Sequence, residues 1–198
     1  ASVGTPLIPT PVDITNLPST FASGSVGSSS RDDMYFSQDG LHLVTADGVT
    51  MYSYDLGTAW DISSITSQTG SKSTSHCSMS GIAMNHDGSK VYPIDYCNAT
   101  MYEWSLSTPY DISSGSQGTS KSVGGSVPVG AYFKSDGLQL WVADQSPDSI
   151  RSYTLGTAWD LSTLSSSVYT LTLDSQNPEG MTFAPDGLSF YIGYNSND

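Results

Sequence analysis

A repeat of about 49 residues runs through this chain and limits the folds that it can adopt. The dipeptide Asp-Gly recurs at intervals of 48, 49 and 50 residues, at positions 39–40, 87–88, 136–137 and 186–187. A second motif keeps the same period: LGTAWDIS starts at residue 56, LSTPYDIS at 106, LGTAWDLS at 155, and a weaker copy, IPTPVDIT, at 8. We call these four eight-residue motifs octets. Periods of this length are typical of proteins built from repeated supersecondary units.

Each repeat unit carries the pattern of four short β-strands. Apolar runs flank the Asp-Gly dipeptide, as at 34–36 and 41–44, and Asp-Gly accepts the positive φ of a tight hairpin turn. A third run, such as 51–54, precedes each octet, and a Ser/Thr-rich stretch follows it. This last stretch is the most polar, as expected for a strand at a solvent-facing edge. No stretch shows a helical apolar period of useful length.

Four strands in a unit of this size are typical of a β-propeller blade. We therefore predict an all-β, four-bladed β-propeller in which residues 1–198 form one domain. The predicted blades are 31–78, 79–127, 128–177, and 178–198 together with 1–30. The octet aspartates are expected to bond backbone amides just ahead of them, and Trp60, Tyr110 and Trp159 are expected to fill the gaps between blades.

The fourth predicted blade is split between the two ends of the sequence. Residues 178–198 supply its first two strands, and residues 1–30 supply the other two. Two arrangements follow. The N-terminal strands complete the blade within the same chain, or they complete the blade of the next molecule, which gives a head-to-tail filament unless the ring closes.

These units resemble propeller repeats of bacteria and phages that read F-S-x-D-G-x-x-L-Y-V-x-D followed by Y-x-L-s-T-a-W-D-I-S, and they are similar in design to YVTN-type and NHL-type repeats. Residues 36–40 and 133–137 carry the first half of the pattern, and the octets carry the second. The resemblance covers nearly the whole chain. It implies the propeller fold, and since such repeats occur in many extracellular and viral proteins, it implies little about function.

The charge of the chain excludes some classes of partner. Six basic residues against nineteen acidic ones give a formal charge of −13, which repels phosphate backbones and anionic lipids. We therefore expect no nucleic-acid partner. No apolar run approaches the roughly 20 residues of a spanning helix, so we expect no membrane insertion. The first residue is Ala1 rather than methionine, which fits removal of a signal peptide.

The two cysteines are placed to pair. Cys77 precedes the first strand of the second unit and Cys97 follows its second strand, and these two points lie at the same end of an antiparallel hairpin. A disulfide predicts an oxidising compartment, and hence an extracellular location. Two free thiols, or a metal site that includes His76, are the alternatives. The sequon Asn98-Ala99-Thr100 makes Asn98 a candidate for N-glycosylation.

Acidic residues are expected to gather on one face of the propeller. Asp47, Asp95 and Asp144 end the second strands and recur once per unit, so we expect them to fasten the loops that follow. Asp32, Asp33 and Glu179 precede first strands without a regular repeat. These three are the candidate metal or ligand face, and calcium is the cation that such oxygen ligands suit.

No catalytic constellation is evident, because His42 and His86 are expected at the opposite end of the ring from His76. The leading hypothesis is a non-enzymatic extracellular structural or interaction protein: a virion-surface or appendage component, or a cell-surface filament subunit that self-assembles or binds other proteins. The first alternative is a lectin-like propeller that binds glycans through Tyr52, Tyr102, Trp104 and Trp141, although core packing explains these aromatics equally well. The second is a calcium-dependent hydrolase or lactonase of propeller form.

Overall fold

The computed structural model describes residues 33–166, 169–173, 177–184 and 189–195. Within these ranges the chain is all-β and forms four antiparallel sheets of four, four, four and two strands. In each sheet the strands pair in the order in which they occur in the sequence. This simple up-and-down order is the one that short turns between successive apolar runs produce.

Each of the first three predicted units contains one four-stranded sheet. The first sheet holds β1 (Asp33–Phe36), β2 (His42–Asp47), β3 (Thr50–Leu56) and β4 (Ile65–Ser73). The second holds β5 (Met79–Met84), β6 (Lys90–Asp95), β7 (Thr100–Leu106) and β8 (Gly115–Ser122). The third holds β9 (Pro128–Phe133), β10 (Gln139–Gln145), β11 (Asp148–Thr154) and β12 (Tyr169–Thr172). The fourth pairs β13 (Asn177–Phe183) with β14 (Phe190–Asn195).

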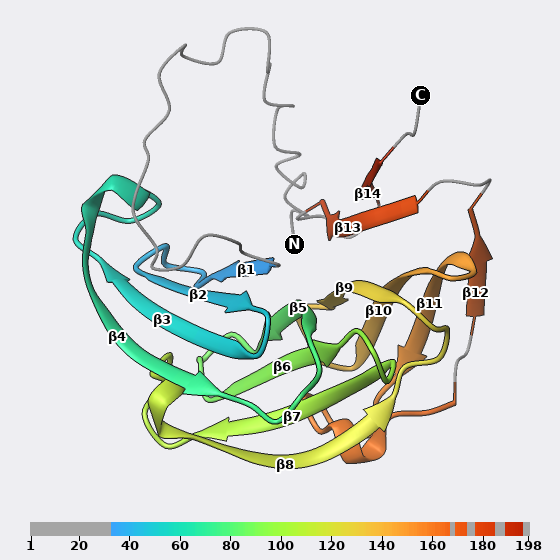
Figure 1. Cartoon of the computed structure of the whole chain (residues 1–198), viewed down its shortest axis with the longest axis horizontal. Coiled ribbons are helices and arrows are strands. Elements are labelled where there is room, and N and C mark those ends of the chain that lie inside the picture. Colours follow the sequence, from blue (N-terminus) through green and yellow to red (C-terminus); the bar gives the residue numbers. More distant parts are fainter. Residues whose placement is uncertain (1–32, 167–168, 174–176, 185–188, 196–198) are drawn as a thin grey trace, which may run out of the picture.

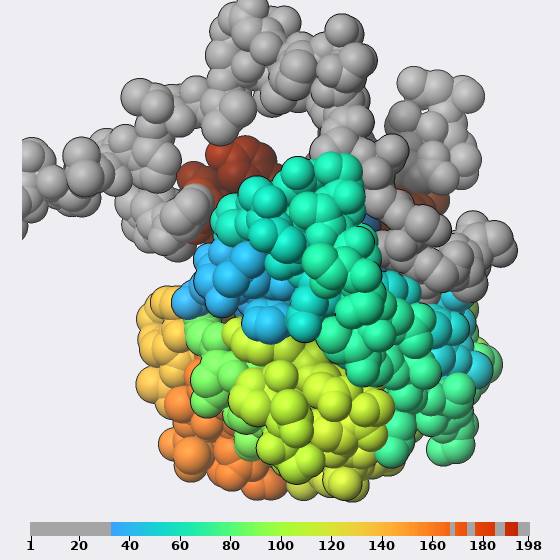
Figure 2. All heavy atoms as spheres, turned by 90° about the vertical axis from the view of Figure 1, so that its left-hand side faces the viewer, coloured from blue at the N-terminus to red at the C-terminus, as the bar shows by residue number. Residues whose placement is uncertain are grey.

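The first strand of every sheet faces the middle of the molecule. Figure 1 shows β1, β5, β9 and β13 at the centre, and β4, β8 and β12 at the periphery. β1 contacts β5, β5 contacts β9, and β9 contacts β13. Seen from the side, the first sheet (blue to teal) lies directly beside the second (green to yellow-green) in Figure 2. The predicted polar fourth strands are therefore the outer edges.

The central strands approach each other at glycines. A Cβ atom added to Gly81 would lie 3.3 Å from the Cα of Gly130, and one added to Gly130 would lie 3.4 Å from the Cα of Gly180. These glycines stand six residues before the Asp of each Asp-Gly turn, where the first sheet has Asp33 (39 − 6). No described atom lies within 4 Å of a Cβ built on Gly180, so β13 has no comparable neighbour on its other side within the described residues.

Apolar side chains fill the spaces between the sheets. One core cluster joins the first and second sheets, with Val44 and Met51 packed with Met79 and Val91. A second cluster joins the second and third sheets, with Tyr92 and Ile94 packed with Phe133, Leu140 and Val142. Burial of both sheet faces accounts for the dense apolar content of the second and third strands of each sheet.

Each of the three described octets is attached to the Asp-Gly turn of its own sheet. Gly40, Gly88 and Gly137 have φ values of 72°, 71° and 71°, as the turn prediction requires. The backbone N–H groups of Trp60, Tyr110 and Trp159 donate to the carbonyl oxygens of these glycines at 2.9, 2.9 and 3.0 Å. The aromatic rings then lie over the glycines, because a Cβ at Gly137 would come within 2.3 Å of the indole of Trp159. The octet thus packs on the Asp-Gly turn at the end of the sheet.

The octet aspartates cap short 3₁₀ helices. η2 (Ile62–Ser64), η3 (Ile112–Ser114) and η4 (Leu161–Thr163) follow Asp61, Asp111 and Asp160. Each carboxylate accepts a hydrogen bond from the backbone N–H two residues ahead, at 2.9 Å in all three. The predicted role of these aspartates is confirmed, and it is the ordinary preference of Asp for the N-cap position.

The predicted completion of the fourth sheet by residues 1–30 lies outside the described residues. No helix among the described residues is long and apolar enough to cross a membrane.

Candidate ligand-binding site

A cavity of about 370 Å³ lies where the four central strands meet. Residues of β1, β5, β9 and β13 all contribute to its wall. Its volume lies within the range of about 300–1,000 Å³ that is usual for small-molecule sites. Burial raises the pKa of Tyr35, on β1, to about 12.

Aromatic and polar groups meet at the end of the cavity where the Asp-Gly turns lie. Trp60 and Trp159 come from the octets of the first and third sheets, and Gln38 and His86 come from the turns of the first and second. The Trp159 ring lies 5.2 Å from the ring of His86, edge to face, and His86 is hydrogen-bonded to Gln38. The Trp60 side chain is 60% exposed. This end of the cavity offers flat apolar rings beside amide and imidazole hydrogen-bonding groups.

The octet aromatics differ in what they contact across the gap between sheets. Tyr110 stacks on His42 of the first sheet, with ring centroids 4.5 Å apart, and Trp159 contacts His86 of the second sheet. The predicted position between adjacent sheets is therefore observed for Tyr110 and Trp159. Trp60 contacts Phe36 and Gly40 of its own sheet and lines the cavity.

The candidate acidic face consists of Asp32, Asp33 and Glu179, and the two of these that the structure describes do not form a metal site. The Asp33 carboxylate accepts hydrogen bonds from the backbone N–H groups of Met34 and Ile82, both at 2.8 Å, and so ties β1 to β5. Glu179 accepts from the side chain of Gln145, at 3.4 Å, which links the third and fourth sheets. Asp32 lies outside the described residues. In the described ranges, Asp33 and Glu179 are not brought together with a third metal-ligating side chain.

The recurring aspartates fasten loops, as predicted, at the two positions where their partners are described. Asp144 accepts from the backbone N–H groups of Ser126, Val127 and Ser146. Asp95 accepts from the backbone N–H groups of Cys77 and Cys97 and from the Asn98 amide. Both oxygens of Asp95 have hydrogen-bond partners, whereas the three donors of Asp144 all share one oxygen and its other oxygen is buried without a partner among the described residues.

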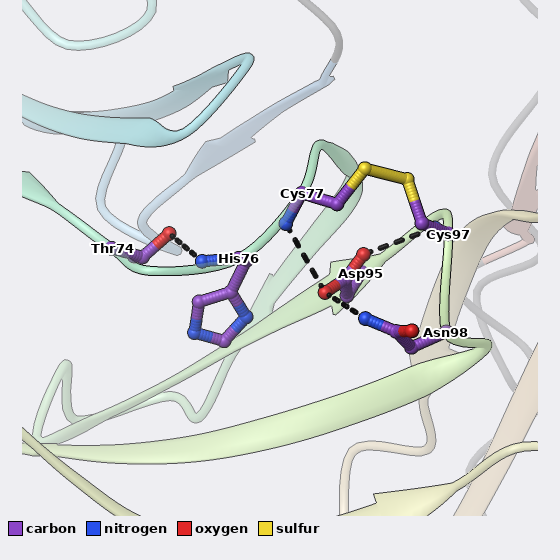
Figure 3. The surroundings of a disulfide bond; sticks show 6 residues. All are labelled: Thr74, His76, Cys77, Asp95, Cys97 and Asn98. Atoms are coloured by element: carbon purple, nitrogen blue, oxygen red, sulfur yellow. Dashed lines mark hydrogen bonds between the residues drawn. A yellow bond between two sulfur atoms is a disulfide. The ribbon is translucent and has the colours of Figure 1, made fainter.

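Cys77 and Cys97 form a disulfide with their Cα atoms 6.0 Å apart. Figure 3 shows Asp95 beneath this bridge, directed at the backbone of both cysteine loops. The sulfurs and the Asp95 carboxylate form the one described cluster of metal-ligating types, but disulfide sulfurs are not the thiolates that bind a metal. His76 points its Nε2 at Gln117, 3.2 Å away, rather than joining a metal site. The bridge indicates an oxidising compartment.

Asn98 lies in the turn between β6 and β7, beside the disulfide. The residue is exposed, and its amide donates to Asp95 at 3.0 Å. The Thr100 hydroxyl donates to the Asn98 carbonyl oxygen at 2.9 Å. The sequon therefore lies on a turn, with Asn98 exposed, Ala99 buried and the Asn98 amide bonded to Asp95.

The four aromatics predicted for glycan binding take part in packing. Trp104 is buried, and Tyr102 contacts the ring of His76 at 3.8 Å between centroids. Trp141 contacts Tyr132 and Phe183, and Tyr52 packs against the first-sheet core. These residues come from three different sheets and do not meet in one pocket. The sequence did not indicate Trp60 and Trp159 as ligand candidates, because an aromatic residue recurs at this position of the octet and the recurrence suggested packing alone.

A polar junction between the second and third sheets was also missed. Glu103 accepts from Lys90 at 2.6 Å and from the backbone N–H of Leu161 at 2.7 Å. Lys90 and the Tyr92 hydroxyl both donate to the carbonyl oxygen of Trp159, at 2.8 and 2.6 Å. Burial, with the Glu103 charge nearby, raises the pKa of Tyr92 far above its usual range. The junction holds the third octet against the second sheet.

No family model and no curated protein sequence matches this chain. Among solved structures it is similar to a functionally unknown protein from Desulfotomaculum acetoxidans DSM 771, with 19% identity and a TM-score of 0.61, over 85% of this chain and 50% of that one. It is also similar to a chain in a crystal structure of the mitotic checkpoint complex, with 10% identity and a TM-score of 0.60, over 83% of this chain and 47% of that one. These likenesses show a shared fold alone. The chain spans about half the length of the two structures.

Proposed function

We propose that this chain is a non-enzymatic structural or interaction module that works outside the cell or on a virion surface, as an appendage component or filament subunit. The observation that carries the proposal is the fourth sheet, in which the described residues supply two strands where each of the other sheets has four. Phe190 and Tyr191 on β14 are 41% and 63% exposed. Among the described residues β14 pairs with β13 alone, and exposed aromatics on such a strand call for a covering strand, from this chain or from another copy.

The architecture that we propose is a four-bladed β-propeller whose fourth blade is completed by residues 1–30. Three four-stranded sheets placed side by side, with their first strands around one cavity, support it. The repeat adds support, because residues 8–15 carry the octet that the fourth sheet otherwise lacks. Removal of residues 1–30 should lower the melting temperature, and replacement of these residues by a Gly/Ser segment of equal length should lower it as much. A melting temperature unchanged by both alterations would refute the shared blade.

The compartment is supported by the Cys77–Cys97 disulfide, which persists in oxidising surroundings. The exposed sequon at Asn98 fits a surface glycoprotein where the host glycosylates. Intact source cells or particles can be treated with a membrane-impermeant amine label. Labelling of this chain without lysis is expected. Labelling only after lysis, with both cysteines reduced, would overturn the proposed location.

The central cavity favours glycan binding as a second candidate function. Trp60 and Trp159 present indole faces, on which the C–H face of a sugar ring stacks, and Gln38 and His86 can bond hydroxyl groups. A glycan array tests this directly. If a sugar binds here, Trp60→Ala should abolish binding and Trp60→Phe should keep part of it, while Tyr169→Ala, at an exposed aromatic of the third sheet, should leave it intact.

A further inference from the structure

The second and third octets each dock on the sheet that precedes them, through one backbone hydrogen bond and one buried side chain. In the second octet, the N–H of Ile112 donates to the Ser53 hydroxyl of β3 at 3.3 Å, and the Ile112 side chain is fully buried. In the third octet, the N–H of Leu161 donates to the Glu103 carboxylate of β7 at 2.7 Å, and Leu161 is fully buried. The same two contacts thus occur at both described junctions.

The acceptor has a fixed place in the repeat. Ser53 stands three residues before the first residue of its octet, Leu56, and Glu103 stands three before Leu106. The same position in the third sheet is Ser152, three before Leu155. Counting back from the N-terminal octet at Ile8 gives Thr5. All four positions therefore carry a side-chain oxygen that can accept a hydrogen bond.

The third sheet offers a place for an octet that none of the described residues fills. Ser152 lines a cavity of about 130 Å³ between the third and fourth sheets. The other lining residues are apolar or aromatic: Trp141, Ile150, Tyr169, Leu171, Phe183 and Phe190. Tyr169 and Phe190 are 64% and 41% exposed. We call this cavity the third-sheet socket. It combines a side-chain oxygen that can accept a hydrogen bond with an apolar hollow, and the two occupied junctions likewise pair a side-chain oxygen acceptor with a buried apolar side chain.

The first octet shows the converse: it has no described sheet to dock on. Ile62 of the first octet corresponds to Ile112 and Leu161, yet it is only half-buried, and η2 has no buried residue. The sheet that would precede the first octet is the fourth, whose third-strand position falls at Thr5. Within the described residues, one octet has no preceding sheet and one sheet has no following octet, which matches the split repeat at residues 1–30.

We infer that residues 8–15 of this same chain occupy the third-sheet socket, with the Ile14 side chain in the hollow and the Ile14 N–H donating to Ser152. Ile14 follows Asp13, as Ile112 follows Asp111 and Leu161 follows Asp160. The inference rests on the proposed completion of the fourth sheet and adds its register. Thr5 then faces Ile62, and the series of four junctions is closed.

Cysteine cross-linking tests the register. Ile14→Cys with Ser152→Cys should give an intrachain disulfide after oxidation with copper phenanthroline, assigned by peptide mass mapping apart from the native Cys77–Cys97 bridge. Ser53→Cys with Ile112→Cys, at the described junction, is the positive control. Ile14→Cys with Ser53→Cys is the negative control, because Ser53 already serves the second octet.

The outcomes separate the alternatives. An intrachain 14–152 link, with the positive control linked and the negative control unlinked, supports the inference. A 14–152 link between two chains would overturn it in favour of a second copy as the occupant. No 14–152 link beside a linked positive control, or equal linking in the negative control, would also overturn it. If the protein without residues 1–30 is nevertheless destabilised, the shared blade stands and only this register fails.

Discussion

Gly40, Gly88 and Gly137 are restricted twice, by their backbone dihedral angles and by the aromatic rings that cover them. The ring of Trp60, Tyr110 or Trp159 takes the space that a Cβ atom would need. The Asp-Gly turn and the octet therefore depend on each other although about 20 residues separate them. This dependence explains at the residue level why both motifs share one period.

Gly137→Ala tests the double restriction. A left-handed φ costs an ordinary residue about 1–2 kcal/mol, and displacement of the Trp159 ring should bring the total to about 3 kcal/mol. Gly48→Ala is the matched control, since Gly48 has a φ of 55° but nothing within 4 Å of the added methyl group. It should lose only about 1 kcal/mol. The free energies of unfolding come from urea denaturation, and equal losses in the two variants would refute the steric role of the ring.

The aspartates of the three described Asp-Gly turns should make the stability of the protein depend on pH in the acidic range. Hydrogen bonds from Ser37 to Asp39, from Ser89 to Asp87 and from Lys134 to Asp136 hold the pKa of each carboxyl below its ordinary value of 3.8. A lowered folded pKa stabilises the protein above the unfolded value, and this stabilisation is lost as the pH falls through the folded value.

The variant with Asp39, Asp87 and Asp136 all replaced by Asn keeps the amide-accepting oxygens but removes this titration. Its melting temperature should therefore fall less than that of the wild type between about pH 5 and about pH 2.5. Thermal melts followed by circular dichroism at several pH values measure the difference. Parallel declines in the two proteins would show that these turns contribute nothing to acid sensitivity.

At the scale of the strands, the local sequence was sufficient to predict the strand positions, because recognisable turn motifs separate the strands. Asp-Gly marks the first turn, and the octet marks the end of the third strand. The Cys77–Cys97 bridge followed from the hairpin alone, since the start of one strand and the end of the next must lie together. The contacts between sheets were not predictable in this way, because their partners come from different units.

Asp33 illustrates why contacts between sheets could not be predicted from the sequence. Its failure to repeat made it a ligand candidate, yet its carboxylate bonds the N–H of Ile82 at the level where Gly81, Gly130 and Gly180 let the central strands approach. The sequence does not show which neighbouring strand lies within reach of a side chain. The Lys90–Glu103 junction was missed for the same reason, since Leu161, whose N–H bonds to Glu103, lies 58 residues further along the chain.

Glu103→Ala should weaken the attachment of the third sheet to the second. The variant leaves Lys90 without its ion pair and the Leu161 N–H without an acceptor, in a place where the Glu103 side chain is only 12% exposed, so we expect a loss of about 3 kcal/mol. Glu103→Gln keeps an oxygen for Leu161 and should lose about 1 kcal/mol. Lys134→Ala, at an ion pair exposed on both sides, should lose less than about 0.5 kcal/mol. Equal effects at the two ion pairs, measured by urea denaturation, would contradict a role for burial.

At the scale of the whole molecule, the repeat predicted four sheets, but the central cavity depends on how closely the sheets approach each other. That spacing is set by the glycines of the central strands and by octets that reach across to the preceding sheet. A sequence period reports that the units are alike, and it does not report the angle between them. The residues around the cavity therefore became apparent only from the arrangement of the sheets.

The charge of the whole molecule makes a prediction about contacts between copies. A net charge of −13, with six basic residues in the chain, makes any two copies repel each other over the Debye length, which is about 30 Å at 0.01 M salt and about 3 Å at 1 M. If copies associate through apolar and backbone contacts, added salt should strengthen the association. Sedimentation velocity at fixed protein concentration in low and high sodium chloride measures this, with the chain lacking residues 1–30 as a comparison. Dissociation on addition of salt would contradict the prediction, because it would mean that ion pairs between copies, rather than apolar edges, hold the assembly together.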